Sequence, residues 1–478
     1  MADVPAQQKK SGLPIPRGTL SLGWSDLLWA ISNIKEAQAD EIEKFERKFA
    51  EHLRAREAIY LQSKVLVPAW IDDNLIGAII AADLEPYLVD VRRGSWVVGP
   101  EKIMDDDWKN VSAILVSHMG GCPAPIDELE AIARSKKVAV LEDCSQGWGA
   151  TVRQRPVGSY GDAAVFSFDL FNNFTTLGGG MAVFNNEELA EKARQRLTKL
   201  ESVSNDSVYT ALLSAATTWI ATTRLGFTLT YYPCISLGWA FGANSLHVNF
   251  LIDHPKPQTT PIEFLRPAPI QAALGRRIME WANDQNQKRT RLGRRLLKLL
   301  QEAQIPNLGL PEDIDYGDPV FTSFTVTCEA PEKMARQMSS NTIDTSPGFL
   351  RPIHQIPSFS DHIHYRGTLP NATLLGKSQL YLPLYPSLKE RDLERIVQAC
   401  QDSVEFLLAK GSSSRQPTIR FTPTPPPVAE LSPPSSEAQP LVPEPPAPVE
   451  AEEPGFLVPK EPPKTPQPNP NLQLKLDK

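Results

Sequence analysis

Three polar residues stand at or near the ends of short apolar runs. His118 closes AILVSH, Asp143 closes VAVLED, and Ser167 is the second-last residue of AAVFSF. A carboxylate buried at a strand end is costly unless a partner meets it. An imidazole titrates near neutral pH, although a single His on an apolar strand is more often a core residue with satisfied hydrogen bonds. These residues are therefore the first candidates for a chemical site.

The apolar runs themselves predict the sheet that would position these residues. Residues 113–118 and 138–143 have strand character, and residues 126–137 between them have a helical pattern. A strand, helix and strand joined by short connections form a right-handed crossover in a parallel sheet. Residues 163–168 and 179–184 add two more apolar runs. We therefore expect an α/β fold with a mixed, mostly parallel sheet flanked by helices.

Helices are expected on both sides of this region. Apolar residues recur at helical spacing over residues 38–54. A single long helix is expected over residues 270–303, with Arg and Lys crowding its second half, and charge runs of that sort usually form a solvated face. A strand in FTSFTVTC and a helix in LKERDLERIVQACQDSVEFLL predict a smaller α+β C-terminal domain.

Composition sets the outer limits of the fold. The chain has 478 residues, 41% of them hydrophobic and 22% charged, which is typical of a globular protein with one large domain and a smaller one. We expect a flexible N-terminus over residues 1–15, a large domain over 16–300, a small domain over 301–410 and a disordered tail over 411–478. The tail holds 19 of the 44 prolines, and such a composition buries too little apolar surface to fold.

Charge and cysteine content exclude several functional classes. Lys and Arg total 49 against 56 Asp and Glu, so the net charge of −7 argues against a basic nucleic-acid-binding protein. The five cysteines are dispersed and show no zinc-ligand spacing, so no metal site is expected. A reduced compartment and an N-terminus without an apolar signal segment indicate a cytoplasmic protein.

An apolar insertion at residues 207–252 has two interpretations. Arg224 is the only charged residue between Asp206 and Asp253. We favour a buried helical hairpin or a subunit interface, because the first half is shorter than the ~20 residues that a bilayer-spanning helix needs. The alternative is a membrane-surface contact, with Tyr231, Tyr232 and Trp239 at the level of the lipid headgroups.

The run from VSHMGGCPAPIDELEAIARSKKVAVLEDCSQ through FSFDLFNNFTTLGGGMAVF resembles the core of the DegT family of sugar aminotransferases. LPIPRGTLS, FERKFAEHLRAREAIYL, IQAALG, RPIHQIP and LYLPLYPSLKERDLERI resemble further family segments in the expected order. The family comprises pyridoxal 5′-phosphate (PLP) enzymes of the aspartate-aminotransferase fold, which act on keto-sugars attached to nucleotides. The resemblance therefore implies a PLP-transferase type I-like fold, PLP as cofactor and a nucleotide-sugar ligand.

The resemblance assigns three residues to the cofactor. Asp143 stands where the family carboxylate pairs with the pyridinium nitrogen and keeps the ring an electron sink. Gln146 occupies the matching position beside the ring, and Ser167 stands where a hydroxyl donates to the cofactor phosphate.

Three further residues match positions near the substrate. His118 and His354 match family histidines, with a satisfied core histidine as the alternative for each. Arg266 matches the Arg of the family's Asn-Tyr-Arg segment, which approaches the active site of the neighbouring subunit. Its alternative is a surface arginine before Pro267.

The sequence departs from the family at the residue that carries the chemistry. In the family a lysine follows the Phe-Ser-Phe strand by four residues and forms the Schiff base with the cofactor. That position is Asn172, whose amide is not nucleophilic and does not titrate near neutral pH. Unless another lysine such as Lys64 replaces it, no Schiff base can form.

Further departures concern cofactor retention. The family's phosphate-binding Ser-Gly-Thr motif and its helix are missing where Gln62-Ser63-Lys64 runs directly into VLVPAW. Phe264 replaces the Asn that reaches across the dimer to the phosphate. Asp72 stands where an aromatic residue stacks on the ring, although a loop shift could bring Trp70 there.

Two hypotheses about function follow from this pattern. The first is a family member without transaminase activity that serves as a binding or scaffolding subunit, as a homodimer or beside an active paralogue, in polysaccharide biosynthesis. The alternative is an aminotransferase or dehydratase that holds PLP or its amine form non-covalently through Asp143, Gln146 and Ser167. A peripheral membrane contact through 207–252 is a further possibility, and no nucleic acid partner is expected.

Overall fold

The structure is a computed structural model of the chain. It describes residues 16–17, 21–22, 24–33, 41, 44, 64–82, 84–185, 187–234, 265–312, 316–348 and 350–411. The expected flexible N-terminus, most of the helix expected at 38–54, residues 235–252 of the apolar insertion and the tail from 412 onward lie outside these residues. All described residues belong to one compact unit, Met1–Phe421.

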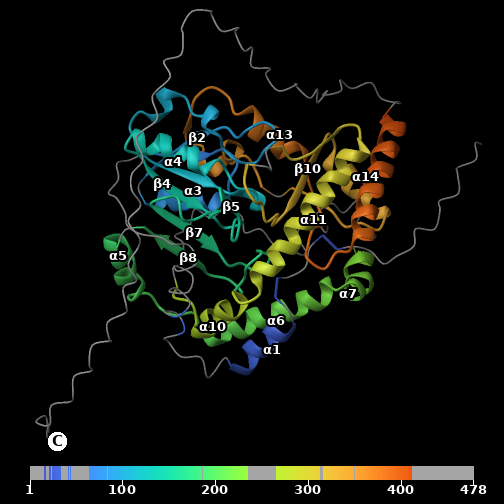
Figure 1. The fold of residues 1–478 in the computed structure, drawn as a ribbon, viewed down its shortest axis with the longest axis horizontal. Coiled ribbons are helices and arrows are strands. Elements are labelled where there is room, and N and C mark those ends of the chain that lie inside the picture. The colour runs from blue at the N-terminus through green and yellow to red at the C-terminus, as the bar shows by residue number, and fades with distance from the viewer. Residues whose placement is uncertain are drawn as a thin grey trace, which may run out of the picture. The chain divides into compact units, whose positions relative to one another are not determined.

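The largest sheet of the described residues has seven strands and lies on the left in Figure 1. Its strands, in spatial order, are β12 (His364–Tyr365), β2 (Glu85–Val89), β1 (Lys64–Pro68), β3 (Val111–Ser117), β4 (Ala139–Asp143), β7 (Ala163–Ser167) and β8 (Gly180–Phe184). Neighbouring strands run parallel except β7 and β8, which are antiparallel. The expected mixed, mostly parallel sheet is confirmed.

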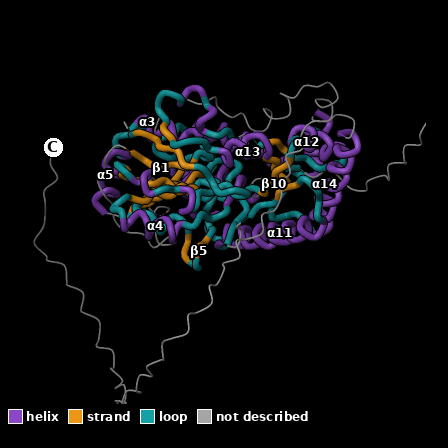
Figure 2. Tube along the Cα trace, turned by 90° about the horizontal axis from the view of Figure 1, so that it is seen from above, coloured by secondary structure: helices purple, strands orange, loops and turns teal. Residues whose placement is uncertain are grey.

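The sheet is buried because helices cover it. Val65, Leu66 and Val67 of β1 are all at most 1% exposed, as expected for a parallel strand that is covered on both faces. Figure 2 shows α3 (Asp73–Ala81) and α4 (Ile126–Ser135) on opposite sides of the strands, and α5 (Glu187–Leu197) follows β8. The α3 helix begins at Asp72, whose carboxylate accepts a hydrogen bond from the Asn74 N–H at 3.0 Å.

A second, four-stranded antiparallel sheet forms from the C-terminal part of the chain. Its order is β11 (Ser346–Pro347), β13 (Gln379–Leu382), β10 (Phe324–Cys328) and β9 (Leu308–Gly309). Helices α12 (Pro331–Ser340), α13 (Pro370–Ser378) and α14 (Glu390–Gly411) complete this α+β region (Figure 2). Shorter elements are β5 (Thr151–Val152), β6 (Arg155–Pro156) and the 3₁₀ turns Pro100–Lys102, Asp105–Trp108, Met119–Gly121, Ile353–Gln355 and Pro357–Phe359.

The single long helix expected over residues 270–303 is wrong. The structure has two helices there, α10 (Pro269–Ile278) and α11 (Ala282–Ala303), separated by a turn at residues 279–281. The break lets each helix pack on a different partner, since α10 contacts α1 (Trp24–Asn33) and α11 contacts α14. The basic half of α11 is also not wholly solvated, because Arg289 is only 5% exposed.

The described half of the apolar insertion forms two helices that are partly buried. α6 (Asn205–Thr222) ends at Thr223, whose hydroxyl then accepts from the Gly226 N–H and begins α7 (Arg224–Leu229). Val208 and Leu212 of α6 are buried, whereas Leu213 is 66% exposed. In the described residues, the helices of the expected buried hairpin therefore bury one side and expose the other.

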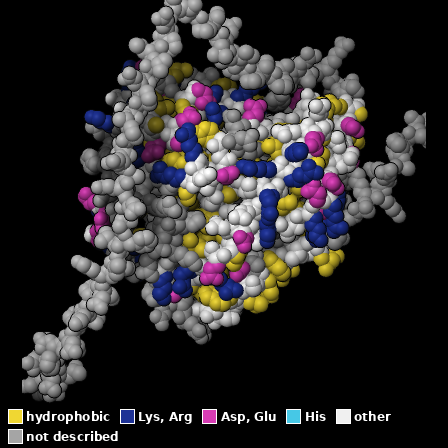
Figure 3. Space-filling view, viewed as in Figure 1, with side chains coloured by type: hydrophobic (Ala, Val, Ile, Leu, Met, Phe, Trp, Pro, Cys, Tyr) yellow, Lys and Arg dark blue, Asp and Glu magenta, His cyan; other side chains and the backbone are white. Residues whose placement is uncertain are grey.

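The outer side of these helices is apolar. Figure 3 shows hydrophobic side chains gathered over α6 and α7, and Leu213, Ile220, Leu225 and Leu229 are all more than half exposed. Within the part of the chain that the structure describes, no helix has both the length and the apolar character needed to cross a bilayer.

Candidate functional site

The carboxyl ends of β3, β4 and β7 place the candidate cofactor residues along one edge of the sheet. Ser117 pairs with Asp143 across β3 and β4, and Asp143 pairs with Val165 on β7, two residues before Ser167. Asp143 is 3% exposed. Its carboxylate accepts from the Ser117 hydroxyl at 2.6 Å and from the Ser145 N–H at 3.0 Å. These bonds orient the carboxylate and satisfy part of its capacity as an acceptor.

Gln146 lies in the turn that follows β4. Its side-chain oxygen accepts from the Gly120 N–H at 2.8 Å, and its carbonyl accepts from the Thr322 hydroxyl at 2.6 Å. The residue therefore joins the loops after β3 and β4 to the segment that leads into β10.

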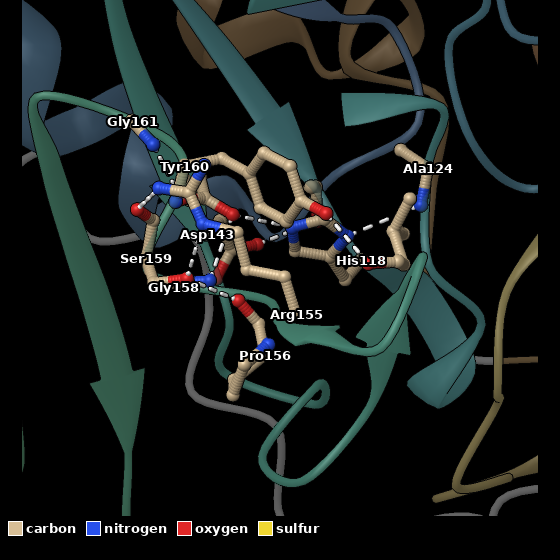
Figure 4. Close-up of polar contacts among 12 residues, drawn as sticks. His118, Ala124, Asp143, Arg155, Pro156, Gly158, Ser159, Tyr160 and Gly161 are labelled. Atoms are coloured by element: carbon tan, nitrogen blue, oxygen red, sulfur yellow. Dashed lines mark hydrogen bonds and ion pairs between the residues drawn. The ribbon is translucent and has the colours of Figure 1, made fainter. Parts of the chain in front are cut away.

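His118 has both ring nitrogens engaged inside the protein. Nδ1 accepts from the Ala124 N–H at 3.1 Å, so the proton of the neutral ring sits on Nε2, which lies 3.2 Å from a Glu142 carboxylate oxygen (Figure 4). The side chain is fully buried. These contacts favour the satisfied core histidine over a residue that meets substrate.

Glu142 organises this region, although the sequence analysis assigned no role to it. Its carboxylate accepts from the N–H groups of Gly158, Tyr160 and Gly161 at 2.6 to 2.7 Å, which fixes the turn after β6 (Figure 4). Cys144 Sγ lies near the same carboxylate and His118, within 4.8 Å of both. Because Glu142 already accepts four hydrogen bonds, the group is explained as a structural network. A charged residue inside an apolar strand was the available signal.

The loop after β7 holds Asn172 in place through internal hydrogen bonds. Its side-chain amide donates to the Ser167 carbonyl at 3.0 Å, and its N–H donates to the Asp169 carbonyl at 3.1 Å. The Ser21 hydroxyl donates to the Asn172 carbonyl at 2.9 Å. Burial raises the pKa of Asp169, a hydrogen bond from the Ser167 hydroxyl opposes this, and nearby Asp72 raises it further.

His354 lies near the carboxyl end of β1, since the Ile353 N–H donates to the Ala69 carbonyl at 3.0 Å. Its Nε2 is 3.0 Å from the Thr373 hydroxyl, and its buried Nδ1 has no hydrogen-bond partner among the described residues. Burial lowers the pKa of His354, and Asp90 opposes the shift. Trp70 follows β1 and is only 1% exposed, so core packing covers its ring.

Arg266 is attached to a different part of the chain. Its Nε donates to the Leu200 carbonyl at 3.0 Å, and its backbone pairs with Glu201 and Val203. The contacts tie it to the segment before α6, which favours the alternative of a structural arginine. Phe264 lies outside the described residues.

Lys64 is at the wrong edge of the sheet to replace a lysine at position 172. It pairs with Val111 at the start of β3, whereas Ser117 at the end of β3 pairs with Asp143. Six residues of parallel strand separate the two edges by about 20 Å. A lysine side chain does not span that distance.

The architecture is that of an aminotransferase of type I fold. DesV from S. venezuelae is similar over 82% of this chain and 99% of that chain, with a TM-score of 0.61 and 22% identity. The E. coli GDP-4-keto-6-deoxy-D-mannose-3-dehydratase with bound hydrated PLP gives a TM-score of 0.58 at 14% identity, over 82% of this chain and all of that chain. The expected type I-like fold is thus confirmed.

The chain belongs to the DegT/DnrJ/EryC1/StrS aminotransferase family, whose model matches residues 74–215 and 265–401. The spore coat polysaccharide biosynthesis protein SpsC of Bacillus subtilis (strain 168) is 25% identical over 397 residues, which cover 77% of this chain and 91% of SpsC. The dTDP-3-amino-3,4,6-trideoxy-alpha-D-glucose transaminase of Streptomyces venezuelae is 24% identical over 384 residues, or 76% and 87% of the two chains. Members of this family use PLP.

The residues at the sheet edge include groups that could meet the ring of this cofactor. Asp143 offers a buried, pre-oriented carboxylate for a protonated ring nitrogen. The loop over residues 168–179 contains no lysine. The Ser167 hydroxyl can meet a phosphate, but it already contacts the Asp169 carboxylate, which disfavours a second anion nearby.

Proposed function

We propose that the protein acts in nucleotide-sugar or polysaccharide biosynthesis and binds PLP or its amine form non-covalently, together with a nucleotide-linked keto-sugar. Family membership and the relatives named above support the substrate class. The observation that carries the proposal is the Asp143 carboxylate, buried at the end of β4 and oriented by Ser117 and Ser145.

Asp143 would hold a proton on the ring nitrogen, because a carboxylate in a buried site stabilises an adjacent cation. Gln146 would lie beside the ring, and the Ser167 hydroxyl would have to turn from the Asp169 carboxylate to donate to the phosphate. When bound, the cofactor supplies an electron sink for bonds next to its reactive carbon. The protein would supply the orientation and exclude water.

With Asn172 at the position of the family lysine, no Schiff base would hold the cofactor at this residue. An amide neither attacks a carbonyl nor transfers protons near neutral pH. Its side chain is instead used within the loop, through the hydrogen bond to the Ser167 carbonyl. We therefore expect no ordinary transamination, and the reaction would need a proton carrier other than residue 172.

The second candidate function is a binding or scaffolding subunit that has no cofactor chemistry. The same Asn172 contacts favour it, since they stabilise the loop without a ligand. Such a subunit would work as a homodimer or with an active paralogue. The division into a large domain over 16–300 and a small domain over 301–410 also stays a prediction.

Cofactor titration separates these candidates. PLP added to the purified protein should raise the melting temperature in a saturable way and should be lost on dialysis. Asp143→Asn should weaken this binding at least tenfold, whereas Asp361→Asn at an exposed turn should leave it unchanged. No effect of PLP on the wild-type protein would favour the scaffolding subunit. A pyridoxyl group fixed to the chain by borohydride would contradict the non-covalent proposal.

A further inference from the structure

A cavity of about 510 Å³ with a mixed polar and apolar lining lies beside α1 and α11, and it is not formed by the candidate cofactor residues. Its walls include Ser21 and Ser25 near the start of α1, Thr223 between α6 and α7, Arg289 on α11 and Ser387 after β13. This volume is within the range of small-molecule sites. Segments distant in sequence therefore converge on one cavity that is open to solvent.

Arg289 brings an uncompensated positive charge to this cavity. The residue is 5% exposed, and Nη1 donates to the Asn286 side-chain oxygen at 2.7 Å. Among the described residues, no carboxylate forms an ion pair with it, and burial is the only influence on its pKa. Burial lowers the pKa of Arg289 to about 10, which leaves the guanidinium charged at neutral pH. A buried charge that lacks a counter-ion is costly, so such residues commonly serve a ligand.

The other charged groups of the cavity already have partners. Arg224 forms an ion pair with Asp392, and Asp26 forms one with Arg277 at 3.0 Å between Nε and Oδ1. Within each pair, the positive and negative charges cancel. The charge left for a ligand is that of Arg289, so the cavity fits an anion.

The remaining walls fit a ligand with hydroxyl groups. Trp219 and Trp281 supply aromatic surface, and Gln285 supplies an amide. The Tyr385 hydroxyl is buried beside the Arg224–Asp392 pair, and Arg224 interacts with it. Aromatic faces surrounded by hydroxyls and amides suit a sugar, which presents both C–H faces and polar edges.

The cavity is built in part by residues outside the family match. The matched residues are 74–215 and 265–401, so Ser21, Ser25, Trp219 and Thr223 all fall outside them. Contacts nevertheless join it to the loop after β7. Ser21 donates to the Asn172 carbonyl, and Asn173 donates to the side-chain oxygen of Asn286 at 3.2 Å.

We propose that this cavity is a binding site for a phosphorylated sugar, with the phosphate on Arg289 and the sugar ring among the tryptophans and hydroxyls. The site is separate from the proposed cofactor site, because it uses neither Asp143 nor Ser167, and its sugar-nucleotide ligand rests on the proposed function. The phosphate can belong to a free sugar phosphate or to a sugar nucleotide, since the same guanidinium would bind either one.

The test is isothermal titration of the full-length protein with four probes: glucose 1-phosphate, UDP-glucose, glucose and inorganic phosphate. We expect at least one of the two phosphorylated sugars to bind more than tenfold more tightly than glucose or inorganic phosphate. Whichever of the two binds more tightly identifies the source of the phosphate. Failure of both phosphorylated sugars to bind, or equal binding of inorganic phosphate, would overturn the proposal.

Variants then assign the binding to this cavity. Arg289→Met should weaken the phosphorylated sugar at least tenfold, and Arg294→Met, an exposed position on the same helix, should not. Ser25→Tyr keeps Arg289 and fills the cavity from an exposed helix position, so it should abolish binding. This variant provides the test if Arg289→Met fails to fold. Unchanged affinity in Ser25→Tyr or in a folded Arg289→Met variant would contradict the assignment. Asp143→Asn should leave this binding intact, which separates it from the cofactor proposal.

Discussion

The carboxyl edge of the sheet and the Arg289 cavity treat buried charge in opposite ways. At the edge, Glu142 and Asp143 are almost fully buried, and protein donors meet both carboxylates. In the cavity, Arg289 is also buried, but its side-chain hydrogen bond to a described residue goes to the neutral Asn286. The buried charges at the sheet edge are therefore satisfied by protein groups that stabilise the fold, whereas the buried charge in the cavity lacks a counter-ion.

The difference separates residues that hold the fold from residues that hold a ligand. A buried ion with a complete set of internal partners is costly to remove, because its partners become unsatisfied. A buried ion without a counter-ion destabilises the empty protein and gains stability only when a ligand neutralises it. Stability measurements on matched variants therefore test the comparison directly.

The largest effect is expected at Glu142. Glu142→Gln keeps the shape but turns an acceptor into an N–H₂ group that faces backbone N–H donors of the turn at residues 158–161. Hydrogen bonds to a charged group contribute about 1.5–3 kcal/mol each, so the free energy of unfolding should fall by about 3 kcal/mol or more. Urea denaturation measures it. Glu130→Gln, in a partly exposed helical ion pair, should change it by less than about 1 kcal/mol.

The next effect is expected at the ion pair between α7 and α14. Asp392 is fully buried, and it accepts from the Lys389 N–H at 2.9 Å as well as from Arg224. Asp392→Asn should lower the free energy of unfolding by about 1–3 kcal/mol. This loss is smaller than for a fully buried ion pair because the Arg224 side chain is 30% exposed and solvent screens its charge. An equal loss in Arg224→Gln and in the double variant would confirm coupling.

The same pair should also contribute to acid unfolding. Burial raises the pKa of Asp392, but hydrogen bonds from Arg224 and the Lys389 N–H outweigh it, so the net pKa is lowered. The folded pKa is then below the unfolded one, and the contribution is present above pH ~4 and is lost as the pH falls further. Denaturation of Asp392→Asn between pH 5 and 3 should show a weaker loss than the wild type. An identical pH slope in both proteins would contradict this.

The strands were predictable because their burial is local in the sequence. β3, β4, β7 and β8 lie within two residues of the apolar runs at 113–118, 138–143, 163–168 and 179–184. Strands covered on both faces need continuous apolar runs, and the polar residues that follow them fall at one edge by topology. The placement of Asp143 and Ser167 followed from the same pattern.

The unpredicted features depend on contacts between distant segments. The sequence predicts that Arg289 lies on a basic, solvated helix face. In the structure it is buried, and it lines a cavity together with Trp281 and the α6–α7 junction. Glu142 reads as the acidic end of a strand, but its role comes from a turn 16 to 19 residues later. The break at residues 279–281 has no proline or glycine signal, because packing of α10 and α11 on different helices imposes it.

Arg289 itself should show a smaller effect, with the opposite sign. Arg289→Met removes an uncompensated buried charge and keeps most of the side-chain volume, so the free energy of unfolding should stay within about 1 kcal/mol or rise. Urea denaturation without ligand measures it, with the exposed Arg294→Met as the matched control. A loss of 3 kcal/mol or more would show that Arg289 belongs with Glu142 among the residues that hold the fold.

The smallest effect is expected at His354, which sharpens the contrast with His118. Burial lowers the pKa of His354, so its folded pKa lies below the ordinary value of about 6.5. The unfolded chain then binds more protons between the two pKa values, and stability should fall as the pH drops through that window. His354→Gln cannot titrate and keeps a group able to bond the Thr373 hydroxyl, so it should flatten the pH dependence between pH 7 and 5 while changing stability little at pH 8. If stability instead falls more steeply with decreasing pH in this variant than in the wild type, protonation of His354 stabilises the folded protein. That result is expected if the nearby Asp90 outweighs burial.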